Sequence, residues 1–557
     1  MKKLLLSILL LLVSLCSLAQ KAPKAVLKAS QSMVSLLAYS NGKLLAGGTV
    51  FFVGGEGDLV APASLLVGVD SAVVIDAKGG VRQVRNIVGL NDMFGCVKLR
   101  VSWDKKIIPL PISSAGTSVG ERLYMLSYNG NKSGIVKSMA VTAVDSVYSN
   151  AYFTLDVPVG DDCMGLPLLN DKGEVVAIMQ HTASGDSING FAVGATVIPG
   201  LCAGISNFGR GLFPGMAIRT ALPLKKEDAL PCLYMQGIAG DSLSYRKTVD
   251  DFIATFPSAY EGYVAKGEYM AVYCRDMHAA DIAWNRAIEL ASNPADVYFS
   301  KAKTLFSIVQ SGDSTSHPML SVGNAFAAVD KAIEYDAQPL YINYKADMLL
   351  SSGHFVEAAA SYESLASTNM RGPELFAKAS QCYGSVKDYD KSIALLDSAV
   401  NCLGTSVGKA ASPYILTRAL VKMSAKKFRD AVRDYNTYEE VVGETLNANF
   451  YYLREQAEVK SRMFQQALND IEMAIYLEPD NPAYYVEKGV LCYMVRMTDE
   501  GLRTITKAKE LAPDAPDVYY IQGCLHMQNG DKVNARVNLE KALSLGHPNA
   551  EAKIKEL

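Results

Sequence analysis

The sequence predicts a chain of two unlike parts, an all-β domain followed by an all-α array of repeats. Short β-branched runs broken by Gly, Asn and Asp fill the first third of the chain. Small and aromatic residues recur at a fixed spacing through the second half. The length of 557 residues agrees with several domains, because a single domain usually has roughly 100–200 residues.

The first residues predict export. A cationic start at Lys2 and Lys3 precedes an apolar run at 4–15, which is too short for a comfortable membrane span. Ser17-Leu18-Ala19 has the small-x-small pattern of a cleavage site. We expect a signal peptide at residues 1–19 and a periplasmic or secreted protein, free or held at the periphery of the outer membrane.

Two other forms of the amino terminus are open. An uncleaved anchor helix is one, and the polar residues Gln20, Lys21 and Lys24 count against it because they end the apolar run early. A lipid anchor on Cys16 is the other, although Leu15 stands where a lipid-attachment motif needs a small residue.

Composition and cysteines exclude several classes of partner. The net charge is −3 and no long run of Lys or Arg occurs, so we expect no nucleic-acid partner. Nine of the ten cysteines follow the predicted cleavage site, with no CxxC and no His at ligand spacing. We therefore expect no metal site and no cofactor, and we interpret most of these cysteines as buried small apolar residues. An odd number leaves at least one unpaired within the chain.

The amino-terminal domain is expected at residues 30–205. Its predicted strands are short and separated by turn residues, as in an all-β sandwich or barrel. They are residues 35–39, 49–53, 72–75, 97–101, 122–127, 140–144, 152–155 and 174–180.

A series of motifs in this domain resembles trypsin-like serine proteases of the bacterial high-temperature-requirement type. In chain order they are GGTVF at 47–51, DLVAPAS at 58–64, GERLY at 120–124, SGIV at 133–136 and the stretch 156–170. The best match is GLPLLN at 165–170 followed by GEVVAI at 173–178, which in the family is the strand pair behind the nucleophile. The resemblance covers about 170 residues and implies a double β-barrel.

The resemblance also locates three positions where such proteases hold a His, an Asp and a Ser. They fall on Ser64, on Gly95 or its neighbours, and on Met164. None of these residues performs the role of its counterpart. The chain has six histidines, and the first is His181, so no residue before it is a histidine base. We expect a pseudoprotease without catalytic residues.

A cysteine nucleophile is the alternative site. Cys163 lies next to the serine position, and His181 would be its base. In the family, however, the strand of His181 lines the substrate pocket on the side opposite the usual base. The two flanking glycines of the family are Asp162 and Leu166 here, and an anionic side chain beside an oxyanion site opposes its function. Asp161 and Asp162 are interpreted as a solvated turn rather than a metal pair.

Residues 206–256 are expected to connect the two parts. The stretch 207–215 is rich in Gly and Pro, as at a boundary or hinge. Apolar residues at three-to-four spacing predict a capping helix at 242–255. Residues 223–236 are expected to be irregular, because Pro231 would break a helix there.

Residues 257–557 repeat with a period of 34. Tyr451, Tyr485 and Tyr519 follow this step, as do Ala467, Gly501 and Ala535. The pattern is the signature of tetratricopeptide repeats, helix–turn–helix units that stack into a superhelix. We expect about eight units, an inserted surface loop at 307–322 and a polar capping helix at 549–557.

In this family the concave face of the superhelix binds peptides or proteins. The residues expected to face inward are Leu416, Leu420, Met423, Tyr452, Gln456, Val486, Val490, Tyr493, Tyr520 and Met527. We expect this surface to be apolar and aromatic, and to lack the Lys and Asn cluster by which some relatives hold a terminal carboxylate. Half of these residues would equally fit a role in packing the core.

These features favour an exported scaffold or adaptor of the cell envelope, with an inactive protease-like domain and protein or peptide ligands on the repeats. A divergent serine or cysteine endopeptidase that recruits substrates through its repeats is one alternative. A periplasmic, chaperone-like holder of unfolded proteins is the other.

Overall fold

The computed structural model describes residues 22–128, 135–158, 160–180, 189–202, 218–239, 241–312, 317–404, 408–443 and 446–557. The predicted signal peptide and the Gly- and Pro-rich stretch 207–215 lie outside these ranges. The chain divides into two compact units, Met1–Ser292 and Asn293–Leu557. This division falls within the predicted repeat array, so the domain ranges given above stay a prediction. In the described ranges no helix is both long and apolar enough for a membrane crossing.

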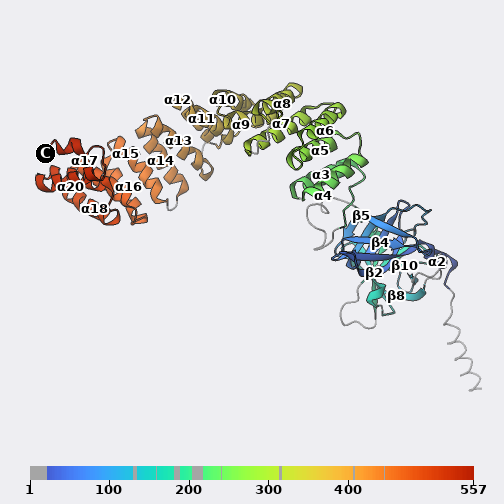
Figure 1. Cartoon of the computed structure of the whole chain (residues 1–557). Helices are drawn as coiled ribbons and strands as arrows, with labels where there is room; N and C mark the ends of the chain where they lie inside the picture. The colour runs from blue at the N-terminus through green and yellow to red at the C-terminus, as the bar shows by residue number, and fades with distance from the viewer. Residues whose placement is uncertain are drawn as a thin grey trace, which may run out of the picture. The chain divides into compact units, whose positions relative to one another are not determined.

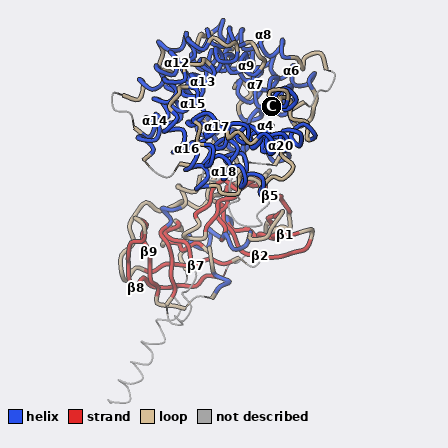
Figure 2. The backbone as a smooth tube through the Cα atoms, turned by 90° about the vertical axis from the view of Figure 1, so that its left-hand side faces the viewer, coloured by secondary structure: helices blue, strands red, loops and turns tan. Residues whose placement is uncertain are grey.

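The first unit contains two closed six-stranded barrels (Figures 1 and 2). The strands of the first barrel are β1 (Met33–Ser40), β2 (Lys43–Phe52), β3 (Asp58–Pro62), β4 (Ser71–Ile75), β5 (Val81–Asn91) and β6 (Cys96–Val101). Those of the second are β7 (Arg122–Ser127), β8 (Ile135–Val147), β9 (Asn150–Leu155), β10 (Pro167–Leu169), β11 (Val175–Gln180) and β12 (Gly190–Gly194). Their orders are β1-β2-β3-β6-β5-β4 and β10-β11-β12-β9-β8-β7, with antiparallel pairing throughout. The predicted trypsin-like double β-barrel is confirmed.

All eight predicted strands lie within or beside these elements, but β3, β5 and β12 were not predicted, and β10 was expected only from the resemblance. Two of the missed strands, β5 and β12, show why. Strand β5 contains two register shifts opposite β6, which break the alternation of apolar and polar residues. Strand β12 begins and ends with glycine, Gly190 and Gly194, and Gly is depleted in strands. Both strands are therefore held by pairing with their neighbours more than by local preference.

The two barrels share an apolar core. Phe51 and Val60 of the first barrel join Tyr124, Val175 and Ile178 of the second in one buried cluster. A hydrogen bond of 2.8 Å from Thr49 Oγ1 to the carbonyl of Tyr128 also links the barrels. The end of β2 and the end of β7 are thereby held next to each other.

After the barrels the chain returns to the first one and then forms helix α3 (Lys226–Ala239). Ile87 of β5 donates to the carbonyl of Arg219 and accepts from the N–H of Ala221, both at 2.7 Å. The irregular segment expected at 223–236 is wrong, because α3 includes Pro231. Packing explains the helix, since Ala229 and Leu233 are fully buried against helix α4 (Ser242–Thr255). Helix α4 coincides with the predicted capping helix.

Eight helix–turn–helix pairs follow among the described residues. They are α5 (Tyr260–Val272) with α6 (Met277–Leu290), α7 (Ala295–Gln310) with α8 (Val322–Tyr335), α9 (Pro339–Ser351) with α10 (Phe355–Ser364), α11 (Pro373–Ser385) with α12 (Tyr389–Asn401), α13 (Ser412–Ser424) with α14 (Phe428–Val442), α15 (Ala448–Lys460) with α16 (Phe464–Leu477), α17 (Pro482–Val495) with α18 (Thr498–Leu511), and α19 (Pro516–Gln528) with α20 (Lys532–Ser544). A short last helix, α21 (Ala550–Ile554), lies within the predicted cap. The predicted fold class, a double barrel followed by helical repeats, is confirmed.

Small residues let helices approach closely, both within a pair and between neighbouring pairs. A Cβ added to Gly523 would lie 2.7 Å from Leu539 Cγ, and one added to Gly501 would lie 2.7 Å from Leu525 Cδ2. The insertion predicted at 307–322 begins later than expected, because helix α7 continues to Gln310. Apolar burial of Ile308 extends this helix into the predicted loop.

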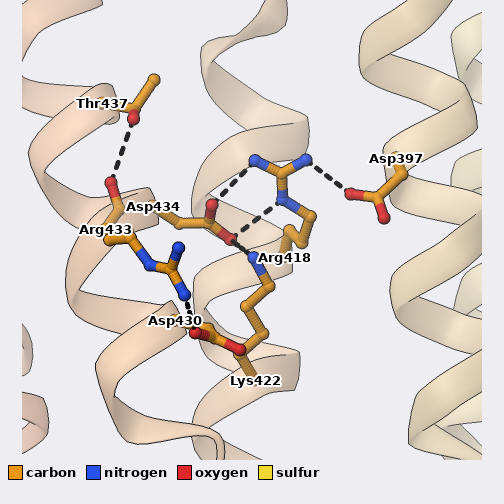
Figure 3. A network of polar contacts seen from close by, with 7 residues as sticks. All are labelled: Asp397, Arg418, Lys422, Asp430, Arg433, Asp434 and Thr437. Carbon is orange, nitrogen blue, oxygen red and sulfur yellow. Dashed lines mark hydrogen bonds and ion pairs between the residues drawn. The ribbon is translucent and has the colours of Figure 1, made fainter.

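Within the second unit, each of three successive first helices places a cation between two acidic residues. Arg418 of α13 forms two hydrogen bonds of 2.7 and 2.9 Å with Asp434 of α14 and one of 2.6 Å with Asp397 of the preceding α12 (Figure 3). Lys422, one helical turn further along α13, lies 2.7 Å from Asp434. The cation thus joins its own pair to the previous pair.

The same arrangement recurs in the next two pairs. Arg454 of α15 contacts Asp470 of α16 at 2.6 Å and Glu439 of α14 at 2.5 Å. Lys488 of α17 lies 2.8 Å from Glu472 of α16 and 2.7 Å from Glu500 of α18. We call Arg418, Arg454 and Lys488 the cation ladder.

Replacing Arg454 by Met should destabilise the protein by about 3–5 kcal/mol, because it leaves Asp470 buried and without its ion-pair partner. The matched variant Arg418→Met should cost clearly less, since Lys422 still neutralises Asp434. Lys507→Met removes an exposed pair with Glu510 and should change stability by less than about 0.5 kcal/mol. Chemical denaturation of the three variants tests this order, and equal losses for both Arg variants would contradict it.

Candidate functional site

The structure brings the three protease-like positions together at the junction of the barrels. Ser64 lies exposed in a 3-10 turn, η3 (Ala63–Leu66), directly after β3. The N–H of Ala63 donates to the carbonyl of Gly95 at 2.8 Å. A Cβ added to Gly165 would lie 2.7 Å from Pro62 Cδ, so the segment with half-buried Met164 packs on the same strand end.

The backbone of this junction is retained while its side chains offer little chemistry. Gly165 adopts φ +73° and Gly95 adopts φ +56°, conformations that favour glycine. Ser64 has a hydroxyl group, Gly95 has only a hydrogen atom as its side chain, and Met164 has a thioether. No imidazole or carboxylate stands at these positions to accept the proton of a nucleophile.

Cys163, the alternative nucleophile, lies in the 3-10 turn η4 (Asp161–Cys163) and is half-buried against the core of the second barrel. Its Sγ lies 3.7 Å from Asp162 Oδ1. Burial raises the pKa of the Cys163 thiol, and the negative charge of Asp162 raises it further. The proposed base, His181, lies outside the described residues. The environment of Cys163 therefore disfavours the thiolate that a cysteine nucleophile needs.

The described residues contain no group of His, Cys, Asp or Glu that could hold a metal ion. All nine cysteines from Cys96 to Cys524 are described, and each is a free thiol. Five of them are buried, namely Cys96, Cys232, Cys382, Cys492 and Cys524.

The predicted inward-facing residues of the repeats are half-buried, apart from Leu420, which is 41% exposed. Leu416 and Met423 pack on the core between α13 and α15, and Tyr452 contacts the ring of Tyr484. Val486, Val490 and Tyr493 border the core under α17 and α19. Tyr520 stacks on His547 with ring centroids 3.9 Å apart, and Met527 is half-buried in α19. These residues thus lie in several apolar clusters along the array, and their role as one binding surface stays a prediction.

Two of them, Gln456 and Val490, line a cavity of about 500 Å³ between α15 and α17. Its apolar wall also includes Val459, Leu491 and Met494. Glu455 and Glu487 contribute carboxyls from facing helices, and Lys460 and Arg462 are exposed at its margin. The surface expected to be apolar and aromatic therefore also carries acidic and basic groups at this place.

Glu455 is the unusual member of this cavity. It is 1% exposed, and its Oε2 accepts a hydrogen bond of 2.7 Å from Gln456. Burial raises the pKa of Glu455 to about 8, and the nearby charge of Glu487 raises it further. Burial likewise raises the pKa of Glu487. The cavity thus has a carboxyl that is held without an ion pair to a cation.

Glu455 was not among the predicted site residues, although the repeat period contains a signal for it. The residue lies at the first-helix position that is Ala419, Gly489 or Gly523 in other pairs, each 12 residues before a small residue of the second helix. Gly523 shows why small residues prevail there, since an added Cβ would collide with Leu539. Glu455 thus departs from the small residues that its period of 34 predicts at this position, and this departure is the signal in the sequence.

Comparisons with known proteins agree with a composite chain. No protein-family model matches it. Over 105 residues the chain is 32% identical to the mitochondrial import receptor subunit TOM70 of Rattus norvegicus, Mus musculus and Homo sapiens. The match covers 19% of this chain and 17% of each relative, so the chain spans about a sixth of their length.

Two solved structures resemble about a third of the chain. The inactive form of a serine-to-alanine mutant of Rv3671c from Mycobacterium tuberculosis is 18% identical with a TM-score of 0.27, over 32% of this chain and 87% of that one. The serine endoprotease from Yersinia pestis is 16% identical with a TM-score of 0.28, over 32% and 63%. The fold assignment depends on the two closed barrels rather than on these matches.

Replacing Glu455 by Ala should make stability less dependent on pH. A carboxyl whose pKa rises from 4.5 to about 8 on folding stabilises the folded state below pH 4.5, and this contribution is lost as the pH rises through about 8. Denaturation between pH 5 and 8 should show a slope smaller by about one proton in the variant. Glu540→Ala, at an exposed carboxylate of α20, should keep the wild-type slope. An unchanged slope in Glu455→Ala would contradict a neutral Glu455.

Proposed function

We propose that this chain is an exported scaffold in which a protease-like double barrel without catalytic activity is joined to repeats that bind a protein partner. The observation that supports this most is the junction of the barrels. There the backbone positions of a protease site meet, but Ser64, Gly95 and Met164 replace its reacting side chains. Loss of one triad member costs roughly 10⁴–10⁶ in rate, and here all three differ.

The cavity between α15 and α17 supports the binding role. It combines an apolar wall with polar groups that give direction, as ligand sites usually do. The similarity to an import receptor subunit over 105 residues adds support for protein ligands on the repeats. The start of the sequence supports export to the periplasm or beyond.

An endopeptidase that uses Cys163 and His181 is less favoured, because burial and Asp162 raise the pKa of the thiol. A chaperone-like holder uses the same surfaces but prefers unfolded clients. Binding of matched folded and unfolded clients separates it from the scaffold, which should prefer its folded partner.

The protein should not cleave polypeptides. Mature protein incubated with unfolded casein, a serine-reactive probe and a thiol-reactive probe should give no fragments and no covalent labelling of a serine. Labelling of accessible cysteines alone is neutral, since nine thiols are present. Casein cleavage that is lost in Cys163→Ala would establish the endopeptidase instead.

Replacing Val490 by Glu should weaken partner binding by more than about tenfold, because it puts a charge on the apolar wall of the cavity. The matched control is Val533→Glu on α20, where the side chain is 74% exposed. The measurement is the amount of the main envelope protein that co-purifies with each variant, after circular dichroism has confirmed equal folding. Equal recovery with both variants would exclude the cavity as the binding site.

A further inference from the structure

Two neighbouring turns of the repeats form a strongly basic depression. Lys426, Lys427 and Arg429 come from the turn between α13 and α14, and Lys460 and Arg462 come from the turn between α15 and α16. They line an open hollow of about 420 Å³, in which Asp430 is the only acidic residue. We call these five cations the basic patch.

Most charges of the basic patch have no counter-ion. Lys427 pairs with Asp390 of α12 at 2.6 Å. Asp430, which also lines the hollow, pairs with Arg433 on its own helix. Among the described residues, no ion pair involves Lys426, Arg429, Lys460 or Arg462. The hollow therefore carries a surplus of positive charge, which Asp430 and the cavity carboxyls Glu455 and Glu487 near Lys460 offset only in part.

The backbone at this patch favours a different residue. Lys426 has φ +58° and Arg462 has φ +60°. The equivalent turn positions in two other pairs are Gly353 and Gly530, with φ +81° and +79°. Glycine adopts this left-handed conformation without the steric cost that a Cβ brings. Cations hold the same position in three further pairs, namely Arg275, Lys387 and Arg496, with φ +56°, +63° and +62°. A cation at this turn is therefore common in the chain, and the basic patch is distinguished by the two further cations beside it, Lys427 and Arg429.

The basic patch adjoins the cavity between α15 and α17, because Lys460 and Arg462 line both. Inside the cavity Val459, Val490 and Met494 accept an apolar side chain, and their apolar surface disfavours the entry of a charged carboxylate. Outside it, the cations attract carboxylates. The two neighbouring hollows therefore select different side chains of one ligand.

We propose that the basic patch binds an acidic segment of the partner protein, with an adjacent apolar residue of that segment in the cavity. This inference rests on the proposed function, since it names the chemistry of the ligand that the repeats hold. Carboxylates near unpaired Lys and Arg speed association and fix orientation, and the effect weakens with salt. A protein segment fits this arrangement better than an anionic membrane does, because the cations line a hollow that continues into an apolar cavity.

The test uses the full mature chain and three probes. The first is a short fluorescein-labelled peptide with one leucine followed by four glutamates. The second is the same peptide with glutamines in place of the glutamates, and the third is vesicles of phosphatidylglycerol. Affinities are measured by fluorescence anisotropy or by vesicle co-sedimentation, at low and at physiological salt.

The decisive variant is Lys426→Gly combined with Arg462→Gly, which removes two charges and places the residue that the backbone favours. Its matched control is Arg496→Gly, at the same conformation (φ +62°) in the next turn, outside the basic patch. Both proteins should keep or raise the melting temperature, so loss of folding cannot explain loss of binding. We expect salt-sensitive binding of the glutamate peptide, a loss of at least about tenfold in the double variant, and a change below about twofold in the control.

Four results would overturn the proposal. They are no binding of the glutamate peptide, equal binding of the glutamine peptide, equal loss in the control variant, or binding of the vesicles alone. The envelope partner distinguishes this inference from the proposed function. Suppose that the partner is lost with Val490→Glu but retained by the double Gly variant. The cavity between α15 and α17 then binds the partner without the basic patch, and only the inference fails.

Discussion

The arrangement of the second unit depends on cations that are held between neighbouring repeats. Apolar faces of helices tolerate sliding, because many contacts of similar energy are available to them. A guanidinium that must reach carboxylates on two other helices does not tolerate it, since the planar fork of Arg fixes both distance and orientation. Arg454 of α15 and Lys488 of α17 both form ion pairs with carboxylates of α16, Asp470 and Glu472. Helix α16 thus holds α15 and α17 on either side of it, and the cavity between them depends on these pairs.

Local sequence predicted the elements well wherever packing and periodicity agreed. Helix α4 was predicted to the residue, and the small residues of the 34-residue period are buried as expected. The prediction failed at Pro231, where burial of Leu233 and its neighbours outweighs the lost backbone hydrogen bond. It also failed at β5, where pairing across bulges replaces alternation. In both places contacts distant in sequence decide the structure.

The candidate sites differ in how far the sequence alone could predict them. The triad positions could be located because the resemblance supplied an order of motifs, and the hydrogen bond between Ala63 and Gly95 shows that they meet. The acidic cavity could not be predicted from the sequence of a single helix, because Glu455 in an isolated first helix would be predicted to be exposed. Its burial arises from the facing helix α17 and from the second helix of its own pair. The positive φ angles of Lys426 and Arg462 were equally unpredictable, since Lys and Arg show no preference for the left-handed conformation.

The nine free thiols have a kinetic consequence for biogenesis. No described part of the fold contains a disulfide, so packing and hydrogen bonds hold the described residues together. In an oxidising compartment, the unfolded chain would instead risk wrong cross-links until its cysteines are covered. Repeats reduce that exposure, because their contacts are local in sequence and form quickly. Cys382, Cys492 and Cys524 are buried inside such repeats, so folding of the array would cover these thiols.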